Sequence, residues 1–329
     1  MALPDNSKIV ILGTGGTVAG SSTRVGDNIG YSAAQVGVAQ LLGAIEALPA
    51  ALRGRELLTE QVDQVDSKDM SFGLWQRLAA RCAHWLADAS VQGIVITHGT
   101  DTLEETAWFL QSVLQPGKPV VLTCAMRPAT ALAPDGPQNI LDAVAVALDP
   151  GAQGVVAVCA GVVHSARDVR KDHPYRLDAF GSGDSGPLGF VEENSVRWVN
   201  HVRKDDLSIE KWSLPAIENI LKSGSWPRVE IVMNYAGASG TTVDLLVRDG
   251  VQGLVAACTG NGSLHQDLEA ALIRAQAAGV KVVRATRCAQ GRVLPKPGDL
   301  IGDSNGLSPV KARVTLILAL LGAQTARTA

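Results

Sequence analysis

The sequence predicts an α/β protein of two domains, a larger N-terminal domain on a doubly wound, mostly parallel sheet and a smaller C-terminal parallel α/β domain. Apolar runs of strand length alternate with amphipathic stretches of helix length, which is typical of strands and helices arranged around a parallel sheet. The 329 residues exceed what one core usually organises. Aromatic residues make up only 4% of a chain that is 46% hydrophobic, so burial must rest on Val, Leu, Ile and Ala, which suits buried parallel strands.

The elements of the larger domain follow from hydrophobic period and from the residues that end each run. A first strand is expected at residues 8–12, because this apolar run enters the Gly-Thr-Gly-Gly-Thr sequence of residues 13–17, which is typical of a tight loop. A helix at 103–114 carries Glu104 and Glu105 in its first turn, where the helix dipole favours acidic side chains. The remaining expected elements are helices at 36–48, 72–89 and 139–147 and strands at 57–65, 93–97, 119–124 and 154–160.

The alternation is interrupted at residues 190–228 and then resumes. This stretch is polar, with prolines and tryptophans, so we expect β-rich edge structure that leads into a connector. The renewed alternation predicts the smaller domain, with strands at 229–233, 253–257 and 280–284 and helices at 242–248, 264–278 and 309–321. We therefore expect an N-terminal domain at 1–205, a linker at 206–227 and a C-terminal domain at 228–329.

Composition excludes several classes of function. A formal net charge of −3 with no strong basic face argues against nucleic-acid binding. No apolar run approaches the length of a membrane span and no secretory signal is visible, so we expect a cytoplasmic protein, although the mature form of a secreted protein would look the same. The five cysteines are widely spread and are expected to be buried thiols, and the six histidines lack the spacing of metal ligands.

Polar clusters follow several of the expected strands, at the edge where open α/β sheets bind ligands. The first cluster, residues 13–20, leaves three interpretations open. Its glycines can cradle a phosphate, although Val18 occupies the third small position of a dinucleotide-binding loop. They can expose Thr17 as a nucleophile, or they can form an ordinary tight turn between a strand and a helix.

The second cluster is His98-Gly99-Thr100-Asp101, which places a hydroxyl beside a carboxylate at a strand end. This pair can serve catalysis, or Thr100 or Asp101 can cap the following helix with Glu104 as the partner in a capping box. The two roles are compatible, since a capping residue can also face a cleft. His98 can act as a base, but a single histidine at a strand end is more commonly a hydrogen-bonded packing residue.

Three further features are ambiguous. The charge run of residues 167–173 is typical of a solvated loop, and Lys171 becomes a candidate only if the fold carries it to the Thr-Asp pair. The Gly-Asp-Ser-Gly sequence of residues 183–186 mimics a serine-protease nucleophile segment, but no other triad element is recognisable, so a glycine turn is the better interpretation. Asn261 is either a turn residue that tolerates positive φ or a side chain whose amide points into a site.

Together and in this order, these motifs resemble the bacterial-type L-asparaginase and glutaminase-asparaginase family, over nearly the whole chain. The Thr-Gly-Gly-Thr element that ends at Thr17 and the His-Gly-Thr-Asp element that ends at Asp101 are highly specific in combination. The residues that carry the resemblance are 14–20, Tyr31, 36–37, 66–70, 96–102, 104–107, 125–128, 135–137, 186–189 and 260–262.

The resemblance implies an amidohydrolase that releases ammonia from L-asparagine through a threonine nucleophile. Thr17 is implied as that nucleophile, with Tyr31 on a mobile loop over it. Thr100 is implied as the second threonine of the site, with Asp101 and Lys171 behind it. The resemblance further implies no cofactor, and a homotetramer built as a dimer of dimers with the site between subunits.

The resemblance also implies which residues contact the substrate. Ser67 and Asp101 are implied to hold its α-carboxylate and α-ammonium groups, and Asn261 is implied to reach it from a neighbouring subunit. The other residues implied to line the substrate site are Gly16, Lys68, Asp69, Gly99, Thr100 and Ala125.

The chemistry of these residues is consistent with the implied roles. A threonine hydroxyl is a weak nucleophile and needs a base or polarising partners. Backbone N–H groups of glycine loops at helix starts can stabilise an oxyanion. Lys171 is an awkward base beside Asp101, because an adjacent carboxylate favours the protonated ammonium. We therefore expect Thr17 to attack, while Lys171 and Asp101 organise charge and relay protons around Thr100.

Two departures from the family pattern stand out. Many relatives, especially periplasmic ones, carry Gln where this chain has Lys68, and a cation there repels the α-ammonium of the substrate unless its head points elsewhere or neighbours the carboxylate. Residues 292–305 show no clear counterpart of the acidic residue that some relatives contribute from a neighbouring subunit.

Three rival functions remain. A dual glutaminase-asparaginase is the nearest, because one extra methylene is discriminated by only about 1–3 kcal/mol. An amidotransferase subunit that feeds ammonia to a tRNA-bound substrate usually has an added N-terminal domain, whereas here the first strand begins at residue 8. A non-catalytic amino-acid-binding module would keep the fold, but the joint presence of Thr17, Tyr31, Thr100 and Lys171 argues against it.

Overall fold

The computed structural model describes residues 7–24, 26–201 and 225–328 and divides the chain into two compact units, Met1–Lys211 and Trp212–Ala329. The predicted linker, residues 206–227, lies outside the described residues except for its last three positions. The two units are described separately below.

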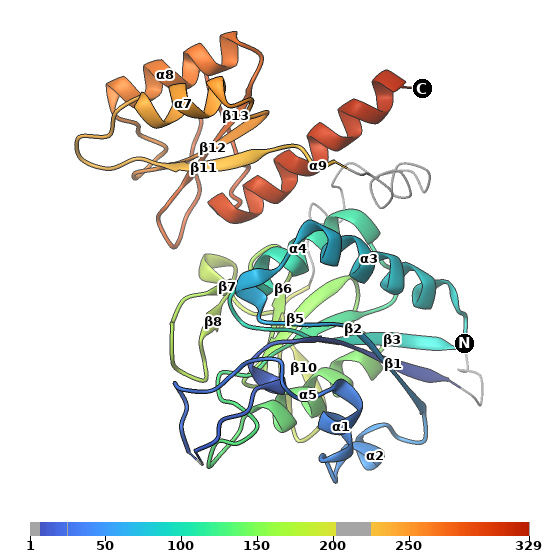
Figure 1. Ribbon diagram of the computed structural model, residues 1–329. Coiled ribbons are helices and arrows are strands. Elements are labelled where there is room, and N and C mark those ends of the chain that lie inside the picture. Colours follow the sequence, from blue (N-terminus) through green and yellow to red (C-terminus); the bar gives the residue numbers. More distant parts are fainter. Residues whose placement is uncertain (1–6, 25, 202–224, 329) are drawn as a thin grey trace. The chain divides into compact units, whose positions relative to one another are not determined.

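The first unit is built on one eight-stranded sheet, which confirms the predicted fold class (Figure 1). Its strand order is β10-β9-β6-β5-β4-β3-β1-β2. Strands β2, β1, β3, β4 and β5 run parallel, while β6, β9 and β10 add an antiparallel edge. The bounds are β1 Lys8–Gly15, β2 Glu56–Val65, β3 Val91–Thr97, β4 Val120–Thr123, β5 Val155–Cys159, β6 Val162–Ser165, β9 Gly189–Glu192 and β10 Ser195–Trp198.

Helices cover both faces of this sheet, as a doubly wound topology requires (Figure 1). Helices α1, α2 and α5 lie on one face, where side chains such as Ile9, Ile11 and Val95 pack against Ile140 and Val144 of α5. Helices α3 and α4 lie on the other face. The bounds are α1 Val38–Gly43, α2 Leu48–Ala51, α3 Phe72–Ala87, α4 Leu103–Leu114 and α5 Gly136–Leu148.

The helix predicted at 36–48 is wrong as a single element, because the chain forms two short helices instead. Helix α1 ends at Gly43 and α2 begins at Leu48, with Pro49 in its first turn. Glycine disfavours helix continuation and proline cannot donate the backbone hydrogen bond of a helix interior, so the break falls between them. The other predicted helices and strands of this unit are found with shifts of a few residues at their ends.

The hairpin at the edge of the sheet was predicted only as β-rich structure, and a second, two-stranded sheet was absent from the prediction. Strands β9 and β10 form an antiparallel hairpin whose turn residues Glu193 and Asn194 both have positive φ, which confirms the predicted β-rich edge as far as residue 201. A separate two-stranded sheet pairs β7, Arg170–Lys171, with β8, Phe180–Gly181. The Gly-Asp-Ser-Gly sequence forms a 3₁₀ turn that ends at Gly186, whose φ is 68°, so the glycine-turn interpretation is confirmed.

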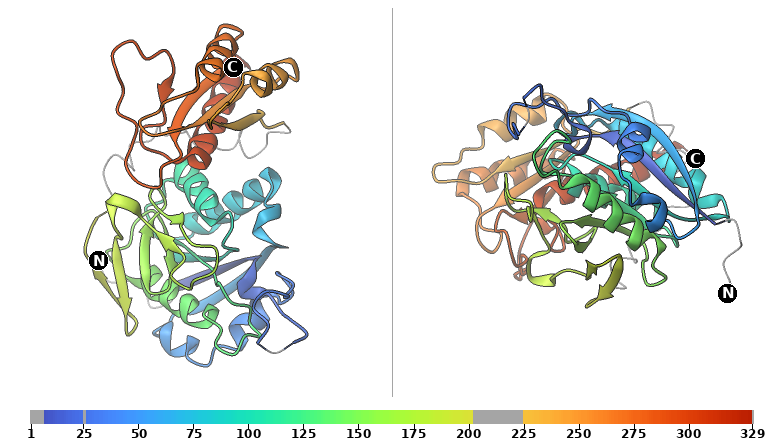
Figure 2. Two further views of the ribbon diagram at one scale, coloured as in Figure 1. Left: turned by 90° about the vertical axis from the view of Figure 1, so that its left-hand side faces the viewer. Right: turned by 90° about the horizontal axis from the view of Figure 1, so that it is seen from below.

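The second unit has a four-stranded parallel sheet in the order β11-β12-β13-β14. Its elements are coloured from yellow to red in Figure 2. Leu254, Ala256 and Cys258 of β12 join the core beneath α7 and α8, while Leu316 of α9 contacts the same strand at Gly253. The bounds are β11 Val229–Met233, β12 Gly253–Cys258, β13 Lys281–Thr286, β14 Gly302–Asp303, α7 Thr241–Arg248, α8 Gln266–Ala277 and α9 Pro309–Thr328. Among the described residues, no helix has both the length and the apolar character of a membrane span.

Candidate active site

The loop after β1 packs against the loop after β3 through glycines on both sides. Gly15 and Gly16 have φ values of 101° and 82°, which L side chains rarely adopt. A Cβ on Gly16 would lie 2.4 Å from the Cα of Gly99, so the two backbones touch with no room for a side chain. The Thr14 hydroxyl also donates to the carbonyl of Thr97 at 2.9 Å. The tight-turn interpretation of this loop is therefore confirmed.

Thr17 lies directly after this contact, at the first position of a 3₁₀ helix, Thr17–Ala19. Its side chain is largely buried, and its Oγ1 lies 2.7 Å from the phenolic oxygen of Tyr31. The Tyr31 ring packs against Gly20, where a Cβ would lie 2.8 Å from the ring. The threonine hydroxyl thus has one hydrogen-bonding neighbour with an exchangeable proton.

The approach to Tyr31 is shaped by Asp27. Its Oδ1 accepts hydrogen bonds from the backbone N–H groups of Ile29 at 3.0 Å and Gly30 at 2.7 Å. These two bonds, with that of Gly30 the stronger, lower the pKa of the Asp27 carboxyl. The turn fixes the direction in which the chain enters Tyr31, and a backbone pairing between Ser21 and Ser32 closes the loop.

Thr100, Asp101 and Lys171 form a second group of contacts. The Lys171 ammonium donates to the Thr100 hydroxyl at 2.8 Å and to the Asp101 carboxylate at 2.6 Å. Lys171 reaches them from β7, and its backbone N–H donates to Glu104 Oε1 at 3.3 Å. The charged segment at residues 167–173, which has the composition of a solvated loop, therefore places the Lys171 ammonium beside Thr100 and Asp101.

The capping-box interpretation of Thr100 and Asp101 is wrong. Helix α4 begins at Leu103, its N-cap is Thr102, and no side chain caps it. The Thr102 hydroxyl donates instead to the carbonyl of Ser67 at 2.8 Å. The side chains of Thr100 and Asp101 are consequently available to Lys171.

Ser67 joins the loop after β2 to the same cluster. Its side chain is almost fully buried, and its Oγ accepts a hydrogen bond from the backbone N–H of Asp101 at 3.1 Å. A Cβ on Gly99 would lie 2.5 Å from this oxygen. The carboxyl ends of β1, β2 and β3 thereby contribute to one group of contacting residues, as parallel strands allow.

Lys68 points toward the carboxylates on either side of it. Its Nζ lies 2.8 Å from Asp66 and 3.2 Å from Asp69, and its side chain is well exposed. Hydrogen bonds to Asp66 and then Asp69 raise the pKa of Lys68. The ammonium is therefore held by acidic neighbours at the rim of the cluster.

Ala125 follows β4 and is completely buried. A Cβ on Gly136, the first residue of α5, would lie 2.8 Å from Val18 and 3.5 Å from the Ala125 methyl. The loop that carries Ala125 is thus packed beside the residue that follows Thr17.

Asn261 belongs to the second unit, whereas the residues described above belong to the first. It stands in the turn of a bridge between Thr259 and Ser263. Its amide is paired with the backbone of Leu294, donating at 3.1 Å and accepting at 2.7 Å.

His98 is a packing residue by its environment. It is fully buried, and its Nδ1 lies 2.7 Å from the carbonyl of Gly99. Burial lowers the pKa of His98 to about 4, against a smaller raising effect of that hydrogen bond. The ring is neutral at physiological pH and binds a proton poorly there.

Residues to which the sequence analysis gave no role in catalysis or substrate binding also shape the site. Glu104 holds the backbone of Lys171, while Asp135 and Asn139 hold the loop that carries Ala125. A sequence signal exists for the second pair, because Asp and Asn at positions i and i+4 face the same side of a helix start.

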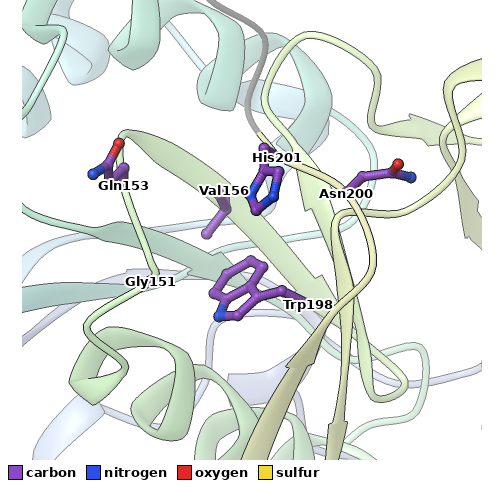
Figure 3. Close-up of a pocket in the computed structure, with 6 residues that line it drawn as sticks. All are labelled: Gly151, Gln153, Val156, Trp198, Asn200 and His201. Atoms are coloured by element: carbon purple, nitrogen blue, oxygen red, sulfur yellow. The ribbon is translucent and has the colours of Figure 1, made fainter.

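The described residues form a cavity outside this cluster, but they form no group that could bind a metal ion. A small cavity of about 140 Å³ is lined by residues near the start of β5 and the end of β10 (Figure 3). Its lining consists of Gly151, Gln153, Val156, Trp198, Asn200 and His201, and none of these is a predicted site residue. Within the described part of the chain, no three His, Cys, Asp or Glu side chains gather in a way that could hold a metal ion.

Comparisons with known proteins agree across the chain. The family model described as Asparaginase, N-terminal matches residues 8–204, and the model described as Glutaminase/Asparaginase C-terminal domain matches residues 228–328. L-asparaginase 2 of Bacillus subtilis is 37% identical over 322 residues, which cover 96% of this chain and 83% of the relative. Glutaminase-asparaginase of Pseudomonas fluorescens is 34% identical, covering 98% and 88%. The crystal structure of a probable cytoplasmic L-asparaginase from Campylobacter jejuni superposes with a TM-score of 0.87 at 36% identity, covering 96% of this chain and 95% of that one.

Proposed function

Because the chain belongs to the asparaginase family, we propose that it hydrolyses L-asparagine to L-aspartate and ammonia with Thr17 as the nucleophile. The chain is an amidohydrolase, and the family resemblance of its motifs is confirmed. The observation that carries the proposal for Thr17 is its 2.7 Å contact with the Tyr31 hydroxyl, in a loop that packs against Gly99, next to Thr100 and Lys171.

The first half of the reaction forms an acyl-enzyme. The Thr17 oxygen bonds to the side-chain carbonyl carbon of asparagine, and the Thr17 proton leaves through the Tyr31 hydroxyl. The C–N bond then breaks, and the nitrogen takes up this proton and leaves as ammonia. An ester between Thr17 and the β-carboxyl group of aspartate remains.

The second half of the reaction hydrolyses the ester. Water adds to the ester carbonyl, the bond to the Thr17 oxygen breaks, and a proton from the water returns to that oxygen. Lys171, paired with Asp101, supplies positive charge beside Thr100 and orders proton transfer there. Lys171 acts through its charge and through the hydrogen bond that it donates to Thr100.

The substrate is proposed to lie at the carboxyl ends of the strands. Ser67 and Asp101, which are joined by a hydrogen bond, would hold the α-carboxylate and α-ammonium groups. Asn261 would contact the substrate from a neighbouring subunit. The remaining lining residues are Gly16, Lys68, Asp69, Gly99, Thr100 and Ala125.

Self-association into a homotetramer is proposed with this function. Large apolar side chains that are more than half exposed on the second unit support it, and they are Met233, Tyr235, Leu245, Leu294 and Leu300. Light scattering of the protein as it elutes from a size-exclusion column should give a molar mass of about four times the chain mass of 34.3 kDa. A cytoplasmic location is proposed as well, supported by the four buried thiols Cys82, Cys124, Cys159 and Cys258.

Ammonia release from L-asparagine and L-glutamine, measured side by side, tests the function. A Thr17→Ala enzyme should lose turnover, while Thr100→Ala should accumulate an acyl-enzyme visible as a mass increase of the intact chain. A Thr17→Ala enzyme that keeps most of its kcat, together with a Thr100→Ala enzyme that forms no acyl-enzyme, would refute the nucleophile. Comparable kcat/KM for both amides would favour the glutaminase-asparaginase alternative, and aspartate binding without any turnover would favour a binding module.

A further inference from the structure

The N-terminus of α5 uses its capping residue in an unusual way. Asp135 occupies the N-cap, where an aspartate normally accepts a hydrogen bond from its own helix. Its carboxylate makes no such bond to a backbone N–H group of α5. It accepts instead from the backbone N–H groups of Met126 and Arg127, both at 2.9 Å, in the loop after β4.

Asn139, one helical turn later, holds the same loop from its other end. Its side chain is almost fully buried, and its Nδ2 donates to the carbonyl of Cys124 at 2.9 Å and lies 3.2 Å from Asp135 Oδ2. Its Oδ1 accepts from the backbone N–H of Ala160 at 3.0 Å, which anchors the amide to the end of the neighbouring strand. The orientation of this amide is therefore fixed by both of its ends.

The two side chains bracket one residue. Cys124, Met126 and Arg127 are held by Asp135 and Asn139, and the residue between them is Ala125. We propose that Asp135 and Asn139 are positioning residues that fix the backbone of Ala125 for the side-chain amide of the substrate. This inference rests on the proposed function, in which Ala125 lines the substrate site.

The chemistry of the pair explains why an aspartate is required at position 135. A carboxylate offers two acceptor oxygens to two N–H donors, whereas a carboxamide offers one oxygen and turns its own NH₂ toward the other donor. Hydrogen bonds to charged groups are stronger than those between neutral groups, so losing one of them is enough to displace this loop. A Cβ on Gly136 would lie 2.8 Å from Val18 and 3.5 Å from the Ala125 methyl, so the start of α5 packs closely beside the loop that carries Ala125.

The test compares two variants of Asp135 with a matched control on the same helix. Asp135→Asn removes one acceptor, and Asp135→Ser removes the carboxylate while keeping a residue favoured at an N-cap. Gln138→Glu is the control, because it replaces an amide that donates to a helix carboxylate, Asp142 at 2.8 Å, without touching the loop. Steady-state kinetics with asparagine and hydrogen–deuterium exchange of peptides covering residues 124–127 are measured for each folded variant.

Both Asp135 variants should raise KM about tenfold with kcat within about twofold of wild type, since substrate binding is lost equally in the ground state and the transition state. Amide exchange at residues 124–127 should be faster in both, and Gln138→Glu should change neither quantity. Unchanged KM or unchanged exchange in the Asp135 variants would overturn this inference alone, as would an equal rise of KM in Gln138→Glu. Absence of asparagine turnover by the wild type would instead overturn the proposed function.

Discussion

The Lys171 ammonium lies 2.8 Å from the Thr100 hydroxyl, although 71 positions separate the two residues in the chain. The same ammonium lies 2.6 Å from Asp101, and its side chain is mostly shielded from water. A charge in this setting acts more strongly on a neighbouring hydroxyl than it would at an open surface. This proximity supports the proposed role of Lys171 as a source of positive charge beside Thr100.

Replacing Lys171 with Met should lower kcat by about 10²–10³-fold, because it removes both the charge and the hydrogen bond to Thr100. Lys171→Arg should keep only part of the activity, because a planar guanidinium cannot reproduce the contact that the compact ammonium makes with the Thr100 hydroxyl. The measurement is steady-state ammonia release. Lys281→Met, on an exposed lysine of β13, is the control for loss of a cation. A Lys171→Met enzyme with at least half of the wild-type kcat would remove Lys171 from the mechanism.

Replacing Tyr31 with Phe should lower kcat by about 10²-fold and leave KM within a few-fold, because only the hydroxyl 2.7 Å from Thr17 is lost. The ring that packs on Gly20 remains, so the loop should keep its position. Tyr235→Phe, on an exposed tyrosine of the second unit, controls for the loss of a phenol. If Tyr31→Phe turns over asparagine within about twofold of wild type, the proton of Thr17 takes another route.

Replacing Lys68 with Gln should lower KM for asparagine by about threefold without changing kcat. The Lys68 ammonium lies 3.2 Å from Asp69 and competes with the substrate α-ammonium for negative charge at the rim. The gain should shrink as salt is added, because exposed charges are screened. Arg77→Gln removes another exposed cation, one paired with Asp63, and should leave KM unchanged. A rise of KM in Lys68→Gln would show that Lys68 binds the substrate carboxylate instead.

His98 should make the folded protein sensitive to acid. Its pKa is lowered by burial from 6.5 to about 4, so between these values the unfolded chain binds a proton that the folded chain does not. The stability contributed by the neutral ring is complete above pH 6.5 and is lost as the pH falls toward 4, by about 1.4 kcal/mol per pH unit.

Urea unfolding of wild type and His98→Asn between pH 7.5 and 4.5 checks this dependence. An asparagine amide can still donate to the carbonyl of Gly99 but does not titrate, so the free-energy difference between the two proteins should narrow as the pH falls. His84→Gln, at an exposed histidine, should run parallel to wild type. A constant difference between wild type and His98→Asn over this range would contradict the shifted pKa.

Local patterns in the chain were enough to predict most of its elements. Apolar runs that end in glycine placed β1 and β3, and the hydrophobic period placed α3 and α4 within a few residues. The break between α1 and α2 was missed because helical spacing of apolar residues continues across Gly43 and Pro49, although the backbone does not. The cap of α4 was misassigned because Thr100, Asp101 and Thr102 are all suitable caps, and only tertiary contacts select among them.

The sequence by itself determined the α/β class, the two alternating regions and the motifs that carry the family resemblance, because each depends on residues that are close in the chain. Tertiary structure alone decided that Lys171 reaches Thr100, that Lys68 is held by Asp66 and Asp69, and that Asp135 binds backbone N–H groups of the loop after β4. Strand pairing brings together residues that are far apart in the chain. In the sequence alone, each polar group has several equally suitable partners, and the sheet determines which of them lies nearby.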